Sequence, residues 1–204
     1  MKTQTVIIAL ATALFAVPVL TDHNRVDQYG RKQGHWTEFP GVDGFPKWEG
    51  LWERLLSAEG DYVNGKMHGH WVLRYAHESP AVDIFDGKVR LGPSAFGIVL
   101  EGPFVNGKQT GHWVVRYDDG SVSEGPVVNG KKHGKWVWRF ADGKVWEGPM
   151  VGGKQHGRWV ERYPSGSVNE GPYVNDKKHG KWVWRKSNGE VTESCWKNNE
   201  LAKC

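Results

Sequence analysis

Hydrophobic and polar positions alternate along most of this chain, in short runs that end at glycine-bearing dipeptides. Between Asn129-Gly130 and Asp142-Gly143, the run from Lys135 to Phe140 is rich in the aromatic and β-branched residues that favour a strand. Both dipeptides suit two-residue type I′ turns, because both central residues of such a turn need a positive φ. The pattern therefore predicts antiparallel strands joined by tight turns, with Lys144 to Val151 as the next strand.

The same unit recurs with a period of 23 residues. A Gly-basic-Trp mark begins at Gly111, Gly134, Gly157 and Gly180. A Glu-Gly mark keeps the same period at Glu101, Glu124, Glu147 and Glu170. A fixed period of this size is the signature of a repeat array. The expected fold class is therefore all-β, an elongated antiparallel meander of repeated β-hairpins.

A two-residue loop at Asp142-Gly143 would fix the register of its hairpin. Counting outward from that loop pairs Phe140 with Val145, Trp138 with Glu147 and Trp136 with Pro149. Because side chains alternate between the faces of a sheet, Trp136 and Trp138 should share one face. Counting around Asn129-Gly130 places Gly125 against Gly134, and two facing glycines would leave a notch that a neighbouring Trp covers.

Four dipeptides of the unit carry a family resemblance: Glu124-Gly125, Asn129-Gly130, His133-Gly134 and Asp142-Gly143. With their equivalents and the matching period, they resemble MORN repeats (membrane occupation and recognition nexus). The resemblance covers Glu101 to about Trp196 well and Tyr29 to Gly92 loosely. The chain departs from the family by carrying Trp136 where a small residue is usual. The resemblance implies a non-enzymatic scaffold that attaches to a protein partner or to a membrane surface.

The first twenty residues, Met1 to Leu20, have the pattern of an export signal. Lys2 supplies the positive start, and Val6 to Leu20 is an uncharged, mostly apolar run of signal-peptide length. The protein is therefore expected to be exported, to the periplasm or outside the cell, with an N-terminal membrane anchor as the alternative. Residues 21–100 then read as irregular, degenerate copies with insertions, and residues 101–204 as the regular array with a C-terminal cap.

Two stretches interrupt the early copies. Leu51 to Ala58 has apolar spacing closer to 3–4 than to 2, which fits a short helix or a strand with an added loop. The segment near His77 to Phe85 and the segment near Arg90 to Val99 exceed the period. Insertions in repeat proteins either contact partners or are tolerated surface loops. A weaker alternative function is an enzyme with its site in residues 80–99.

The lysines of the tight turns are predicted to line one edge of the array as a basic ridge: Lys66, Lys108, Lys131, Lys132, Lys154, Lys177 and Lys178. Such a ridge suits anionic lipid head groups or an acidic protein. The alternative is a solvated edge whose charges discourage pairing with other strands. Net charge is only +4, and export removes most contact with nucleic acid, so nucleic acid is an unlikely partner.

The tryptophans fall into two groups. Trp113, Trp136, Trp159 and Trp182 occupy one repeat position and are predicted to form the core. Trp138, Trp146 and Trp184 lie outside that position, and their use as stacking platforms for sugar rings is the basis of an alternative function, a glycan- or cell-wall-binding module. The Glu of each Glu-Gly mark is expected to pair with Arg or Lys on adjacent strands.

The remaining chemistry is sparse. Cys195 and Cys204 are the only cysteines, and in an exported chain they most simply form one disulfide that closes the last edge. The recurrent histidines are His68, His133, His156 and His179. Adjacent copies about 9–10 Å apart could at most share an ion, but the row as a whole cannot converge on one metal, so packing beside the glycines is the expected role. No catalytic motif is present, so neither an enzyme activity nor a cofactor is expected, and the oligomeric state stays open.

Overall fold

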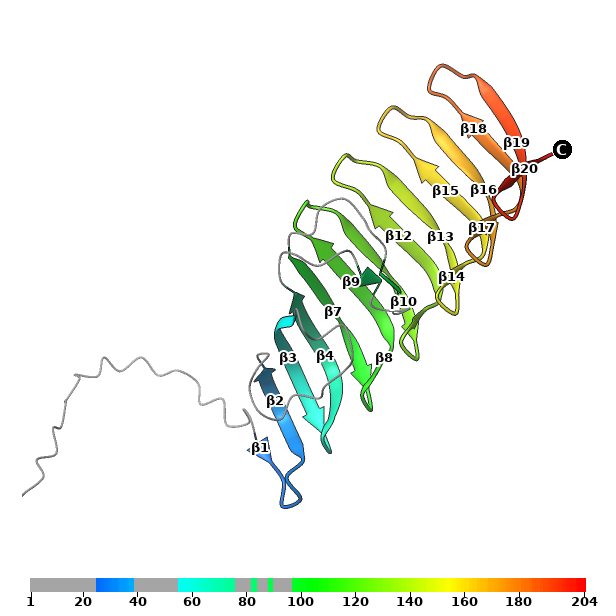
Figure 1. Ribbon diagram of the computed structural model, residues 1–204. Helices are drawn as coiled ribbons and strands as arrows, with labels where there is room; N and C mark the ends of the chain where they lie inside the picture. Colours follow the sequence, from blue (N-terminus) through cyan, green and yellow to red (C-terminus); the bar gives the residue numbers. More distant parts are fainter. Residues whose placement is uncertain (1–24, 39–54, 76–81, 84–87, 90–96) are drawn as a thin grey trace, which may run out of the picture.

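The structure, a computed structural model, describes residues 25–38, 55–75, 82–83, 88–89 and 97–204. Eighteen strands form a single open antiparallel sheet that runs as an elongated rod, with the strands stacked side by side in nearly sequential order (Figure 1). The described residues contain no helix, and the predicted all-β meander is confirmed. The expected signal peptide lies outside the described residues.

The strands are short and follow one another closely. Their bounds are β1 (Arg25–Val26), β2 (Lys32–Glu38), β3 (Leu55–Val63), β4 (Lys66–Tyr75), β5 (Val82–Asp83), β6 (Lys88–Val89), β7 (Ile98–Val105), β8 (Lys108–Gln109), β9 (Gly111–Tyr117), β10 (Val122–Val128), β11 (Lys131–Lys132), β12 (Gly134–Arg139), β13 (Val145–Val151), β14 (Lys154–Gln155), β15 (Gly157–Arg162), β16 (Val168–Val174), β17 (Lys177–Lys178), β18 (Gly180–Arg185), β19 (Val191–Lys197) and β20 (Glu200–Ala202).

The insertion leaves the sheet and returns to it at the same point. Strand β4 pairs directly with β7, with Tyr75 opposite Ile98. Between them β5 and β6 form a separate two-stranded sheet, the end of the expected insertion belongs to β7, and residues 76–81, 84–87 and 90–96 lie outside the described residues. The possible helix at Leu51 to Ala58 is a strand from Leu55 onward, and residues 51–54 lie outside the described residues.

The Asn-Gly turns adopt the predicted conformation. Asn129 and Gly130 have φ values of 51° and 75°, and Val128 pairs with Lys131 across them. Successive turns are also joined to one another, since the Gly130 N–H donates to the Gln109 carbonyl (3.0 Å). The equivalent bond recurs at each following turn, so the turn edge is a continuous backbone ladder.

The loop at Asp142-Gly143 is one residue longer than predicted. Only Gly143 has a positive φ (83°), and Phe140 exchanges backbone hydrogen bonds with Gly143 and Lys144. The loop therefore has three residues, 141–143, as in a type I turn followed by a left-handed glycine. The register changes accordingly: Phe140 lies opposite Lys144, Trp138 opposite Trp146 and Trp136 opposite Gly148.

The predicted pair of facing glycines is also wrong. Gly125 pairs with Trp113 on one side of its strand, and Gly134 pairs with Met150. Between β10 and the β11–β12 segment the register shifts by two residues, because Gly134 (φ 70°) forms a bulge there. The notch consists of Gly125 alone, and the expected Trp does cover it.

Each tryptophan of the core packs flat on a glycine of the preceding strand. A methyl group at Gly148 would lie 2.3 Å from the Trp159 ring, so only glycine fits there. The same close approach joins Gly60 to Trp71, Gly102 to Trp113, Gly125 to Trp136 and Gly171 to Trp182. At the next equivalent position, opposite Trp182, the chain has Ser194 instead, and its Oγ accepts a hydrogen bond from the Trp196 indole (2.9 Å).

These indoles form the core on one face of the single sheet, here called the Trp face. The rings of Trp71, Trp113, Trp136 and Trp159 are fully buried, which confirms the predicted core position. Their N–H groups are satisfied, for example by the Pro126 carbonyl for Trp136 (2.8 Å). The opposite face carries the repeated glutamates and is called the Glu face.

A disulfide between Cys195 and Cys204 joins the two ends of the last hairpin, as expected. Cys195 lies on β19 opposite Ala202 of β20, with a Cα–Cα distance of 5.1 Å between the cysteines. The short strand β20 is therefore held against the end of the array.

Candidate binding surfaces

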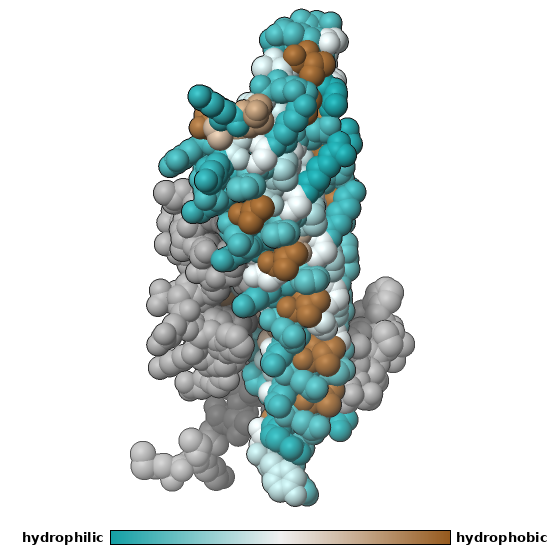
Figure 2. All heavy atoms as spheres, turned by 90° about the vertical axis from the view of Figure 1, so that its right-hand side faces the viewer, coloured by the Kyte–Doolittle hydropathy of each residue, from teal (hydrophilic) through white to brown (hydrophobic). Residues whose placement is uncertain are grey.

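Five of the seven predicted lysines lie on the exposed turn edge. Each sits directly across from an exposed valine, as Lys131 does from Val128 and Lys154 from Val151. The pairs are Val63 with Lys66, Val105 with Lys108, Val128 with Lys131, Val151 with Lys154 and Val174 with Lys177, here called the Lys–Val edge. Figure 2 views this side and shows a line of apolar side chains spaced among hydrophilic ones along the rod.

Lys132 and Lys178 do not belong to that edge, contrary to the prediction. The Lys132 ammonium lies over the Trp136 and Trp138 rings, 4.6 and 4.9 Å from their centroids, and the residue is only 6% exposed. Lys178 lies in the same way 4.2 Å from the Trp182 ring. Both lysines therefore serve the Trp face through cation–π contacts, and Gln155 occupies the equivalent buried position between them.

The charges of the Glu face are paired with one another, as predicted. Glu147 contacts Lys135 (2.7 Å) and Arg162 (3.7 Å), while Glu170 is held between Arg158 and Arg185. The hydrogen bond from Lys135 lowers the pKa of Glu147, and the one from Arg185 lowers the pKa of Glu170. By contrast, the lysines of the Lys–Val edge make no ion pair with any residue that the structure describes.

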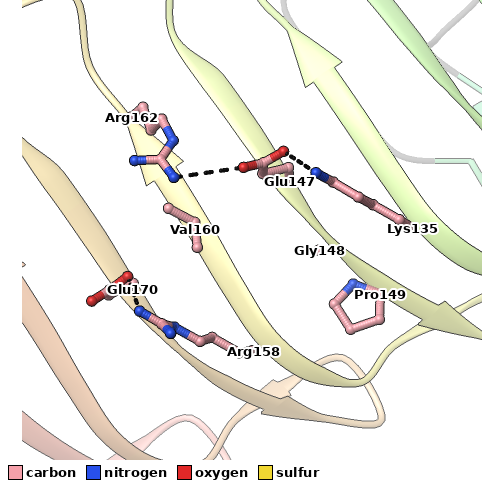
Figure 3. Close-up of a pocket in the computed structure, with 8 residues that line it drawn as sticks. All are labelled: Lys135, Glu147, Gly148, Pro149, Arg158, Val160, Arg162 and Glu170. Carbon is pink, nitrogen blue, oxygen red and sulfur yellow. Dashed lines mark hydrogen bonds and ion pairs between the residues drawn. The ribbon is translucent and has the colours of Figure 1, made fainter.

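A shallow hollow of about 360 Å³ lies on the Glu face between β12 and β16 (Figure 3). Figure 3 shows Lys135 and Arg162 converging on Glu147, with Arg158 directed at Glu170. All the charged groups that line the hollow are therefore engaged with a neighbour. The hollow is part of the ion-pair ladder, and it presents no nucleophile beside a base.

The three tryptophans considered for glycan binding lie on the Trp face, beside the core indoles. Trp138 and Trp146 are partners across two strands, with ring centroids 5.5 Å apart, and Trp146 lies 4.8 Å from the Trp159 ring. Trp184 makes an edge contact with Tyr163 at 5.0 Å. All three are half-buried, so they add to the core and remain accessible.

These tryptophans belong to one row of side chains that crosses the sheet, here called the outer row. Each member is the cross-strand partner of the next. In order they are Leu73, Leu100, Val115, Ser123, Trp138, Trp146, Glu161, Asn169, Trp184 and Thr192. Glu161 and Asn169 were not predicted from the sequence. Glu161 could have been noticed, because the other copies have Leu, Val or Trp at its repeat position.

In the described part of the chain, no group of three or more His, Cys, Asp or Glu side chains is placed to hold a metal ion. Within those same residues there is no helix of the length and apolarity needed to cross a membrane.

The chain matches no protein-family model and no curated protein sequence.

Proposed function

We propose that this protein is a non-enzymatic, exported scaffold of MORN-like repeats that attaches to an anionic membrane surface through the Lys–Val edge. The observation that carries the proposal is the composition of that edge. Five exposed lysines, each free of ion pairs with the described residues, alternate with five valines that are 37–52% exposed.

This combination suits the boundary between water and lipid. Each lysine near an anionic membrane contributes about 1 kcal/mol, so five give roughly 5 kcal/mol at low ionic strength. The valines between them would enter the head-group region and add a hydrophobic contribution that salt does not screen. The valines recur in line at five successive turns, so they form a row along the edge and are not singly scattered surface residues.

The rod geometry lets the contacts of successive turns act together. The backbone ladder between successive turns, such as Gly153 N–H to the Lys132 carbonyl (2.8 Å), fixes each turn relative to the next. Equivalent residues of neighbouring repeats are about 9–10 Å apart, since two strand spacings separate them. A row of weak sites on a stiff support binds a surface cooperatively, because the first contact brings the others near it.

Flotation of the purified protein with liposomes tests the proposal. We expect binding to vesicles that contain phosphatidylserine, little binding to neutral phosphatidylcholine vesicles, and partial release by high salt. Reversing the charge of Lys66, Lys108, Lys131, Lys154 and Lys177 to Glu should abolish flotation. The matched control replaces Lys132 and Lys178 by Gln, the residue at position 155, and should float like the original protein.

The valines are tested separately. Val128→Ser with Val151→Ser should lower the fraction that stays bound in high salt, because it removes the unscreened contribution. Absence of binding to anionic vesicles under all conditions would contradict the membrane proposal and direct attention to acidic proteins of the same compartment. Binding that survives all five charge reversals would assign it to another surface.

A further inference from the structure

Besides the single residues Ser123 and Thr192, the outer row of the Trp face contains one pair of adjacent polar side chains. Glu161 on β15 and Asn169 on β16 are cross-strand partners. Trp146 on β13 lies beside Glu161, and Trp184 on β18 lies beside Asn169. A carboxylate and an amide thus stand side by side between two indoles, on a face whose core is built of aromatic and aliphatic side chains.

The polar pair is held in place by its neighbours. The Asn169 amide donates to Glu161 Oε2 (3.5 Å), and Lys144 Nζ lies 3.3 Å from Glu161 Oε1. The Lys144 ammonium also lies 4.3 Å from the centroid of the Phe140 ring. Burial and a hydrogen bond with Glu161 raise the pKa of Tyr163. The charges of Glu161 and Lys144 balance, so the cluster has no net charge.

The cluster remains accessible. The side chains of Glu161 and Lys144 are 21% and 26% exposed, and Asn169 is also half-buried. The Glu161 carboxylate has four lone-pair positions, and it is contacted by Asn169, Lys144 and Tyr163. The Asn169 amide has in addition an oxygen and a second N–H. Both groups therefore keep unused hydrogen-bonding capacity. Half-buried polar groups with spare capacity between aromatic rings are suited to a ligand that is itself partly polar and partly apolar.

We propose that Glu161, Asn169, Trp146 and Trp184 form a binding site for a neutral oligosaccharide. A sugar ring presents an apolar C–H face that packs on an aromatic ring, and hydroxyl groups that a carboxylate and an amide bind in pairs. Four adjacent strands span about 14 Å between the two tryptophans, which accommodates a short oligosaccharide. A wholly apolar partner would bury the Glu161–Lys144 pair and lose its solvation.

This site is independent of the proposed membrane attachment. It lies on the Trp face, whereas the Lys–Val edge is formed by the turns. The repeat pattern explains the backbone of both surfaces, but it does not explain a carboxylate–amide pair at one place in the outer row. The two proposals therefore fail separately: loss of vesicle binding says nothing about the sugar site.

Isothermal titration calorimetry with three hexasaccharides tests the proposal on the purified full chain. The probes are cellohexaose and the N-acetylglucosamine hexamer, both neutral, with the galacturonic acid hexamer as the charged counterpart. We expect at least one neutral hexamer to bind and to change tryptophan fluorescence, and the charged hexamer to bind more weakly. Binding of neither neutral hexamer, or preference for the charged one, would overturn the proposal.

Two substitutions remove the polar pair while keeping residues that the array already uses. Glu161→Val and Asn169→Ser introduce the residues found at positions 115 and 123 of the same row, so the fold should be retained, as circular dichroism would verify. Each should weaken binding about tenfold or more, because each deletes hydrogen bonds to the sugar.

Thr192→Val, in the same row beyond Trp184, and Lys154→Glu on the turn edge are the controls and should leave the affinity unchanged. Unchanged affinity in both Glu161→Val and Asn169→Ser would overturn the assignment of the site.

Discussion

The two halves of the rod share one row of the Trp face and differ in the next. In both halves the core indoles pack on glycines, as Trp71 does on Gly60 and Trp159 does on Gly148. In β4, β7 and β9 the outer row consists of Leu73, Leu100 and Val115, all at most 5% exposed. In β12 to β18 the outer row consists of half-buried tryptophans and the Glu161–Asn169 pair.

This comparison distinguishes the row that the fold requires, the Gly–Trp row, from the outer row, whose residues differ between the two halves. In the C-terminal half the Gly–Trp row recurs up to Trp182 and holds the fully buried Trp136 and Trp159, and a single sheet needs such a buried layer for stability. The outer row is a closed apolar core in one half and an accessible mixed surface in the other. Function on the Trp face is therefore expected in the C-terminal half.

The largest expected effect tests the shared row. Trp71→Ala and Trp159→Ala should each lower the free energy of unfolding by about 3–5 kcal/mol, because each empties a site that the structure cannot refill. Urea denaturation followed by circular dichroism measures both. Similar losses in the two halves support a common core, whereas a loss confined to Trp71→Ala would show that only the N-terminal half depends on it.

The next largest effect distinguishes the apolar part of the outer row from its mixed, accessible part. Leu100→Asn should cost roughly 2–5 kcal/mol, since it creates a cavity and buries an amide without a designed partner. Asn169→Leu, the reverse change at the equivalent position three repeats away, should alter stability by about 1 kcal/mol or less, because the position is part-exposed. Equal costs at both positions would remove the distinction between a closed and an open row.

A smaller effect tests the space beneath the indoles. Gly148→Ala should destabilise by about 1–3 kcal/mol, because its Cβ would lie 2.3 Å from the Trp159 ring and force that ring to move. Gly152→Asn is the matched control. Position 152 begins a type I′ turn with φ 59°, as Asn129 does in the preceding turn, so the change should be neutral or slightly stabilising. Thermal melting of both variants measures the difference.

The smallest effect per site concerns the ion pairs of the Glu face in the C-terminal half. Hydrogen bonds from Arg139, Lys135 and Arg185 lower the pKa of Glu124, Glu147 and Glu170 below the ordinary value of 4.5. A carboxyl whose pKa is lowered by folding stabilises the folded state fully above about pH 4.5, and that contribution is lost as the pH falls through the lower folded value.

Hydrogen exchange between pH 6 and pH 3 should therefore show the C-terminal half loosening as the pH falls, with about 0–1 kcal/mol for each exposed pair. Glu147→Gln should flatten part of this dependence. A C-terminal half whose protection does not change over this range would contradict the role given to these pairs.

The sequence was sufficient for the period, the all-β class, the Asn-Gly turns and the Trp core, because each depends on local chemistry that repeats. The Asp142-Gly143 loop was mispredicted because Asp-Gly serves both a two-residue turn and a three-residue loop with one left-handed glycine. The choice between them shifts every cross-strand partner by one residue, which is why Trp138 was assigned to Glu147 instead of Trp146.

The candidate surfaces were predicted less completely. The seven turn lysines look alike in sequence, but successive side chains of a strand point to opposite sides. Lys131 therefore lies on the exposed edge, whereas its neighbour Lys132 packs against the Trp138 ring. The tryptophans Trp138, Trp146 and Trp184 were found by their excess over the repeat. Glu161 and Asn169 were not, because a pair that forms only across strands requires the correct register.

The serine at position 194 has a consequence for how rods meet one another. An open sheet made of identical units invites a second copy to add its first strand to the last strand of another, which leads to filaments. Addition in phase would lay an indole on the position of Ser194, where five earlier copies have glycine and a side-chain carbon leaves no room. Strand β20, which the disulfide holds in place, pairs with the C-terminal part of the same strand, from Cys195 to Lys197. We therefore expect the Ser194 side chain and the Cys195–Cys204 disulfide to oppose end-to-end association of rods through this strand.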